Sequence, residues 1–229
     1  RGHEIDPTEL SYRSGDCFLS AGRGRSNEDA VFLDTTGRAY RQPAHSLPSA
    51  RGQGEPLTGR LNPPQGASFV GVAIGESTQQ LLIASDAGYG FIVTLGDMAT
   101  KNKAGKTLLS LPKGALSLPP VPVTDIENAL VAAFSSEGRL LVFPLSDLPI
   151  LGRGKGIKII NIPSARVVDR SEIMQYVVVL APDESIVLVS GKRTLNLKAS
   201  DLKHYRGERA RRGLKLPRGF QKVDGVSVV

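Results

Sequence analysis

Glycines flanked by basic residues recur along the 229-residue chain and are its best candidates for binding chemistry. The four copies are Arg51-Gly52-Gln53-Gly54, Lys103-Ala104-Gly105-Lys106, Gly152-Arg153-Gly154-Lys155-Gly156, and Arg206-Gly207 leading into Arg209-Ala210-Arg211-Arg212-Gly213. Glycine allows a backbone N–H to approach a phosphate closely, and arginine or lysine supplies positive charge. One such loop is explained more simply as an exposed turn, but four copies favour a surface that follows a nucleic-acid backbone.

The cations in and beside these loops are therefore the predicted DNA-binding residues. They are Arg51, Lys103, Lys106, Arg153, Lys155, Lys158, Arg209, Arg211 and Arg212. Four further cations are weaker candidates because they sit at predicted hairpin turns: Arg38, Arg139, Lys192 and Arg193.

Positive charge is concentrated in the C-terminal third. The chain has a formal net charge of +7, with 29 Lys+Arg and 22 Asp+Glu. Residues 1–150 hold 13 and 15 of these, so residues 151–229 hold the remaining 16 and 7, a net +9. Such a field attracts polyanions such as nucleic acid or an acidic membrane surface, although a solvated tail would have the same composition.

Catalytic, metal and cofactor chemistry find little support in the sequence. The single cysteine, Cys17, cannot form an internal disulfide, and the three histidines lack zinc-ligand spacing. Nucleophile-elbow, kinase-type and phosphate-loop motifs are missing from the sequence. Aromatic residues make up 5% and do not alternate with basic ones, which argues against a base-stacking platform for single strands. We predict no catalytic residue, no metal ligand and no cofactor in this chain.

A repeat of about fifty residues must position the glycine loops. Apolar, β-rich runs end at turns containing Gly37, Gly88, Gly138 and Gly191, which are 51, 50 and 53 residues apart. An apolar residue follows each glycine after ten or eleven positions, and three of these follow a small residue and an aspartate, a pattern typical of a short helical turn. The glycine loop comes next, and then an apolar strand that ends at proline.

Each unit predicts a small antiparallel sheet, and successive sheets of this kind pack radially, as in a propeller. We predict an all-β, propeller-like single domain over residues 1–229. Its predicted blades are residues 31–78, 79–127, 128–183 and 184–229, with a partial first blade over residues 1–30. Residues 7–10 and 13–16 match the helical turn and the glycine loop, so the chain is expected to begin inside its first repeat.

Longer stretches of the sequence resemble one protein family. They are Arg1-Gly2-His3-Glu4, residues 47–59 (LPSARGQGEPLTG), residues 84–91 (ASDAGYGF), Lys155-Gly156 with residues 159–165 (IINIPSA), and residues 207–213 (GERARRG). Over nearly its whole length the chain is similar to the C-terminal β-pinwheel domains found in the DNA-cleaving subunits of bacterial type IIA topoisomerases, most closely those of topoisomerase IV. The resemblance implies a β-pinwheel whose blades exchange strands, with duplex DNA bent along its outer basic surface. With four full blades and a partial first one, we expect a broken five-bladed ring.

The same resemblance implies a role and partners. The domain would hold duplex DNA for ATP-dependent strand passage (decatenation and relaxation) by the upstream catalytic core of its own subunit, which works with a separate ATPase subunit. The catalytic tyrosine would lie in that upstream core, so no tyrosine of this chain is expected to be the nucleophile. No apolar run approaches the ~18 residues that span a bilayer. A bacterial, cytoplasmic location on the nucleoid is expected, with peripheral membrane association left open.

Three alternatives remain. Gyrase relatives carry a Gln-Arg/Lys-Arg-Gly-Gly-Arg/Lys-Gly box in the first blade, but the corresponding loop here, Tyr12-Arg13-Ser14-Gly15-Asp16, has one base and one acid. This difference favours a decatenating enzyme over a gyrase-type DNA-wrapping domain. A protein-interaction propeller with a basic docking rim is a second alternative. An enzyme with its site in a central channel is the third, and it lacks a converging catalytic set.

Overall fold

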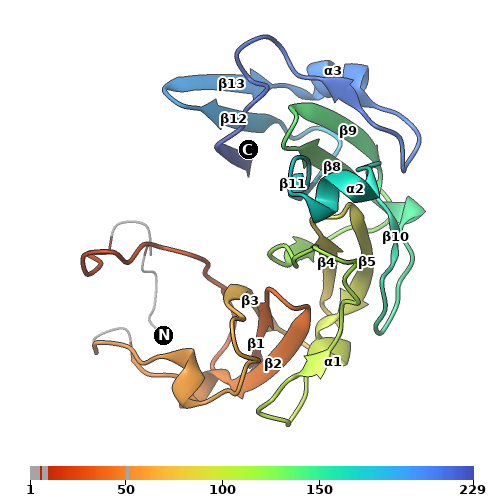
Figure 1. Ribbon diagram of the computed structural model, residues 1–229. Helices are drawn as coiled ribbons and strands as arrows, with labels where there is room; N and C mark the ends of the chain where they lie inside the picture. Colours follow the sequence, from red (N-terminus) through yellow and green to blue (C-terminus); the bar gives the residue numbers. More distant parts are fainter. Residues whose placement is uncertain (1–5, 7–9, 50–51) are drawn as a thin grey trace.

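The computed structural model describes residues 6, 10–49 and 52–229, and it is built almost entirely of short strands. The described strands form four antiparallel sheets that follow one another along an open arc (Figure 1). Their orders are β3(Phe69–Gly75)-β1(Asp29–Asp34)-β2(Arg38–Pro43)-β6(Lys106–Thr107), β10(Ile157–Lys158)-β5(Tyr89–Thr94)-β4(Gln80–Ser85)-β7(Val121–Val123), β11(Met174–Leu180)-β8(Leu130–Ser135)-β9(Arg139–Pro144)-β14(Leu214–Lys215), and β13(Arg193–Leu197)-β12(Ile186–Ser190)-β15(Gly225–Val228). The predicted all-β class is confirmed.

Helical segments are single turns that follow the hairpins or connect strands. The α-helical turns are α1(Leu95–Met98), α2(Ser164–Val168) and α3(Ala199–Leu202). The 3-10 turns are η1(Ala44–Ser46), η2(Leu57–Gly59), η3(Leu145–Asp147) and η4(Lys203–Tyr205). None of the helices in the described ranges is long and apolar enough to cross a membrane.

The hydrophobic core lies between successive sheets. The central strands are apolar on both faces, and all six residues of β8 are buried. One cluster joins the first two sheets through residues such as Leu33 and Phe91, a second joins the second and third, and a third joins the third and fourth. Because each sheet buries its faces against its neighbours, the stacking order of the repeats is fixed by apolar packing.

The blades exchange strands, as the family resemblance implies. The two-residue strands β6, β10 and β14 each come from a glycine loop and pair with the hairpin of the preceding sheet. In each case the hairpin glycine helps to hold the incoming chain. Its carbonyl accepts a hydrogen bond from the residue just after the donated strand: Gly37 from Leu108, Gly88 from Ile159 and Gly138 from Leu216, at 2.7–3.0 Å.

A left-handed glycine directly precedes each donated strand. Gly105, Gly156 and Gly213 have φ of +67°, +74° and +70°. A Cβ on Gly213 would lie 2.5 Å from the carbonyl oxygen of Leu140 in the acceptor strand. Glycine is required here both for the left-handed turn and for the close approach of two backbones.

The exchange should be sensitive to substitution of this glycine. We expect Gly213→Ala to lower the free energy of unfolding by about 2–4 kcal/mol, because it adds a backbone clash to the left-handed strain. Gly66→Ala is the matched control, since Gly66 also has a positive φ, +81°, but no atom lies within 4 Å of its Cβ position. Chemical denaturation would measure both, and equal losses would contradict the proposed close-packing role.

Buried carboxylates stabilise the hairpin turns. Asp34 is fully buried, accepts hydrogen bonds from the backbone N–H groups of Thr36 and Arg38, and receives the Tyr40 hydroxyl at 2.6 Å. The pKa of Tyr40 is raised far above its ordinary value, first because burial disfavours the phenolate and then because Asp34 accepts its proton. The Tyr40 hydroxyl therefore stays protonated and bonded to the turn.

The described residues before Asp29 contain no strand, so a partial fifth blade stays a prediction, as do the blade boundaries. The N-terminal segment, red in Figure 1, lies at the opening of the arc between the first and last sheets. The other end of this opening is formed by β12 and β13.

Candidate nucleic-acid interface

The glycine loops lie next to one another in sequence order. The strand that follows one loop receives the next loop: Gly154 N donates to Leu108 O at 2.9 Å, and Ala210 N donates to Ile159 O at 2.9 Å. An earlier contact of the same kind joins Asn62 N to Lys103 O at 2.8 Å. We call residues 101–107, 152–158 and 206–215 together the loop track. It runs along the donated-strand edges of consecutive sheets, and β10 marks it on the outer side of the arc (Figure 1).

The first two loops of the track present cations to solvent. Lys103, Arg153 and Lys155 are exposed and Lys106 is half-buried, and none of the four makes an ion pair with a described residue. Loop 101–107 contains three lysines and no acid, and loop 152–158 contains three cations and no acid. These side chains are therefore placed to meet an external polyanion.

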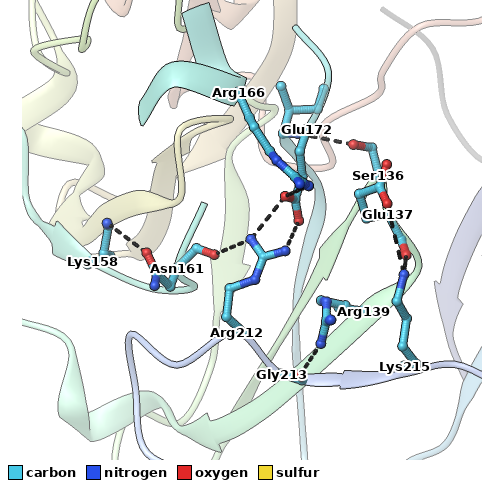
Figure 2. Close-up of polar contacts among 11 residues, drawn as sticks. Ser136, Glu137, Arg139, Lys158, Asn161, Arg166, Glu172, Arg212, Gly213 and Lys215 are labelled. Carbon is cyan, nitrogen blue, oxygen red and sulfur yellow. Dashed lines mark hydrogen bonds and ion pairs between the residues drawn. The ribbon is translucent and has the colours of Figure 1, made fainter. Parts of the chain in front are cut away.

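An aromatic ring supports the second loop. Lys155 Nζ lies 4.0 Å from the centre of the Tyr89 ring, and Lys158 Nζ lies 5.4 Å from it. Tyr89 is the first residue of β5 and occupies the hairpin position that carries arginine in the first and third sheets. Lys158 also donates to Asn161 Oδ1 at 3.0 Å (Figure 2). The ring holds both ammonium groups through cation–π attraction without cancelling their charge.

The third loop has the most cations, but protein groups occupy most of them. Arg209 Nη1 donates to the carbonyl of Lys158 at 2.6 Å, which ties the third loop to the second. Arg211 forms an exposed bidentate pair with Glu208 at 2.8 and 3.0 Å. Lys215 donates to the carbonyl of Glu137 at 2.6 Å. The density of basic residues in the sequence therefore overstates the free charge of this loop.

Arg212 belongs to a buried ion cluster (Figure 2). Its two terminal nitrogens lie 2.9 Å from the two carboxylate oxygens of Glu172, whose side chain is 0% exposed. Arg166 of α2 reaches the same carboxylate at 3.1 Å, and Arg212 also donates to the carbonyl of Asn161. The cluster binds the incoming third loop to the connection between α2 and β11. The geometry gives Arg212 a structural task.

Two of the hairpin arginines hold the donated chain. Arg38 Nε donates to the carbonyl of Ala104 at 3.1 Å, and Arg139 Nη1 donates to the carbonyl of Gly213 at 3.0 Å. Both side chains therefore face a glycine loop of their own chain, while Lys192 and Arg193 at the last hairpin are exposed. Arg51 lies outside the described residues. The DNA-binding role of all thirteen cations stays a prediction, and the geometry favours the four solvent-facing cations of the first two loops.

Sequence reasoning missed Tyr89 and Glu172. Tyr89 could have been found by aligning the hairpins, because it replaces an arginine beside an otherwise common glycine. Glu172 carries no such signal, since its partners Arg166 and Arg212 lie 6 and 40 residues away. Among the described residues, no group of three or more His, Cys, Asp or Glu side chains is placed to hold a metal ion.

Comparison with known proteins places this architecture in one family. A family model described as the DNA gyrase C-terminal domain, a beta-propeller, matches residues 79–116 and 130–168. The A chain of DNA topoisomerase 4 from Pseudomonas aeruginosa is 58% identical over 228 residues, which cover 100% of this chain and 30% of that protein. The chain thus spans about 30% of the length of that curated relative.

Solved structures agree with this match. A structure of the DNA gyrase A C-terminal domain, 14% identical, has a TM-score of 0.71 over 100% of this chain and 74% of that chain, and supports the fold alone. The structure of the Escherichia coli ParC C-terminal domain is 44% identical and has a TM-score of 0.87, covering 99% of this chain and 91% of that chain. The sheet order, the exchanged strands and this full-length similarity lead to one conclusion: the chain belongs to the family of C-terminal β-pinwheel domains of ParC, the DNA-cleaving subunit of topoisomerase IV.

Proposed function

We propose that this domain binds duplex DNA without sequence preference, along the outer edge of the arc, and presents it to the catalytic core of a topoisomerase IV. The observation that carries the proposal is the loop track. Successive glycine loops are joined by backbone hydrogen bonds, and the first two carry solvent-facing cations free of acidic neighbours. A row of cations on a curved edge suits a phosphate backbone that bends around it.

The enzyme-level role rests on the family. In this proposal the domain holds a DNA segment for ATP-dependent strand passage, which decatenates or relaxes DNA. Its partners are the ATPase subunit of the enzyme and the catalytic core that precedes this domain in its own polypeptide. The catalytic tyrosine would belong to that core. The setting would be the nucleoid of the bacterial cytoplasm.

Salt dependence tests the binding mode. With six to eight phosphate contacts, the affinity for a random-sequence duplex should fall by about 10³–10⁵-fold between 50 and 200 mM salt. Fluorescence anisotropy on labelled duplexes of unrelated sequence would measure it, and all sequences should give similar slopes. A flat salt response would overturn the proposal.

A protein-docking rim is the competing function for the same cations. Unlabelled random DNA should displace labelled DNA completely, and an acidic protein should compete only in proportion to its charge. Stoichiometric binding of a protein that random DNA cannot displace would favour the docking function.

A further inference from the structure

One hairpin lacks the donated strand that the other three receive. In the first three sheets the outer edge of β2, β5 or β9 pairs with β6, β10 or β14. The fourth sheet has the order β13-β12-β15, so the outer edge of β13 is unpaired within the described residues. An edge of this kind presents a row of free N–H and C=O groups that another strand can join.

The empty edge keeps the side chain that holds the incoming loop elsewhere. Arg193 is paired with Ser190 across its hairpin, as Arg139 is paired with Ser135. Arg139 donates to a carbonyl of its incoming loop, at Gly213, whereas Arg193 has no hydrogen-bond partner in the part of the chain that the structure describes. A Cβ on Gly219 would collide with the terminal nitrogen of Arg193, which shows that the guanidinium extends beyond the edge of the sheet.

A matching donor segment lies at the other end of the chain. Gly15 has a φ of +90°, like the glycines that precede the three donated strands, but no atom lies within 4 Å of its Cβ position. The residues after it, Asp16-Cys17-Phe18-Leu19, follow the pattern of two strand residues and then apolar ones seen in Gly105-Lys106-Thr107-Leu108-Leu109 and Gly156-Ile157-Lys158-Ile159-Ile160.

The exposure of the apolar pair separates this segment from its counterparts. Leu108 and Ile159, each just after a donated strand, are 0% exposed, whereas Phe18 is 38% and Leu19 is 65% exposed. The N-terminal copy therefore has the sequence and the turn of a donor but has not buried the apolar surface that docking would bury.

We propose that β13 is the acceptor for residues Asp16 and Cys17 of the same chain, and that their pairing closes the ring. By the register of the other blades, Asp16 would lie opposite Thr194 and Cys17 opposite Arg193, and Phe18 N would donate to the hairpin carbonyl. The acid at position 16 suits the cationic edge formed by Lys192 and Arg193. Figure 1 places the donor segment at the opening that this pairing would close.

A disulfide would trap this pairing. Paired residues on antiparallel strands have Cα atoms about 4.5–5.5 Å apart, within the range that a disulfide spans. In Arg193→Cys, oxidised glutathione should join Cys17 to the new cysteine within one chain, at least about tenfold faster than in Thr194→Cys, whose side chain points to the other face. Non-reducing electrophoresis and peptide mapping would identify the linked residues.

Strain at the donor turn supplies the matched control. Gly15→Val in the Arg193→Cys chain should slow the disulfide strongly, because valine resists the left-handed conformation. Gly66→Val, at the equally open Gly66 with φ of +81°, should leave the rate unchanged. Equal rates at positions 193 and 194, no disulfide at either, or a disulfide only between two chains would each overturn the proposal, the last by identifying a second copy as the occupant.

Discussion

Replacing Lys103, Lys106, Arg153 and Lys155 together by alanine is expected to weaken duplex-DNA binding by about 10²–10³-fold near 100 mM salt. These four cations face solvent in the first two loops of the track, with no acidic partner among the described residues. Each lost phosphate contact should also reduce the slope of log K against log salt by about 0.9, so the four together should flatten it by about three to four units. Anisotropy titrations at several salt concentrations would measure both quantities.

A charge-matched control separates the track from the net charge of the domain. Lys113, Lys198, Lys203 and Lys222 are also exposed, or nearly so, but they lie outside the glycine loops. Their joint replacement by alanine removes the same four charges and should change the slope by less than about one unit. If both variants lose affinity equally, the domain binds through its overall field and the track has no special role.

Replacing Glu172 by glutamine should lower the free energy of unfolding by about 2–4 kcal/mol. The carboxylate is 0% exposed and compensates Arg166 and Arg212, which would be left facing an uncharged amide. The loss should fall short of that for a fully buried pair, because the two arginine side chains retain 49% and 32% exposure. Denaturant titration followed by circular dichroism would measure it.

Glu208→Gln is the matched control for this substitution. Glu208 pairs with Arg211, but both side chains are more than 70% exposed, at 78% and 72%. Exposed pairs of this kind contribute little, so stability should stay within about 0.5 kcal/mol of the parent chain. If the Glu208 and Glu172 variants lose the same stability, the buried cluster does not anchor the third loop.

Together these variants distinguish two kinds of cation that look alike in the sequence. Arg212→Leu should reduce stability with a small change in the salt slope at temperatures where the variant stays folded, whereas Lys103→Ala should do the reverse. The difference arises because Arg212 already has a buried carboxylate as its partner, while Lys103 has solvent.

Local patterns predicted the hairpins and the repeat. Gly37, Gly88 and Gly138 mark turns between apolar runs, and a turn needs only residues that are adjacent in the chain. The glycine loops were found in the same way, but the partners of their cations were not. Arg38 meets Ala104 across 66 residues, and Arg212 meets Glu172 across 40, so these contacts exist only once neighbouring blades have packed. Counting charges therefore predicted which edge is basic but not which of its cations remain free.

The central claim is that the solvent-facing cations of successive loops contact DNA together. Acetylation of lysines in the unmodified chain, with and without a saturating random-sequence duplex, tests it most directly, and mass spectrometry can follow each lysine. We predict that DNA protects Lys103, Lys106 and Lys155 while Lys113, Lys198 and Lys222 keep their reactivity. Uniform protection of all lysines, or protection confined to the second group, would contradict the account.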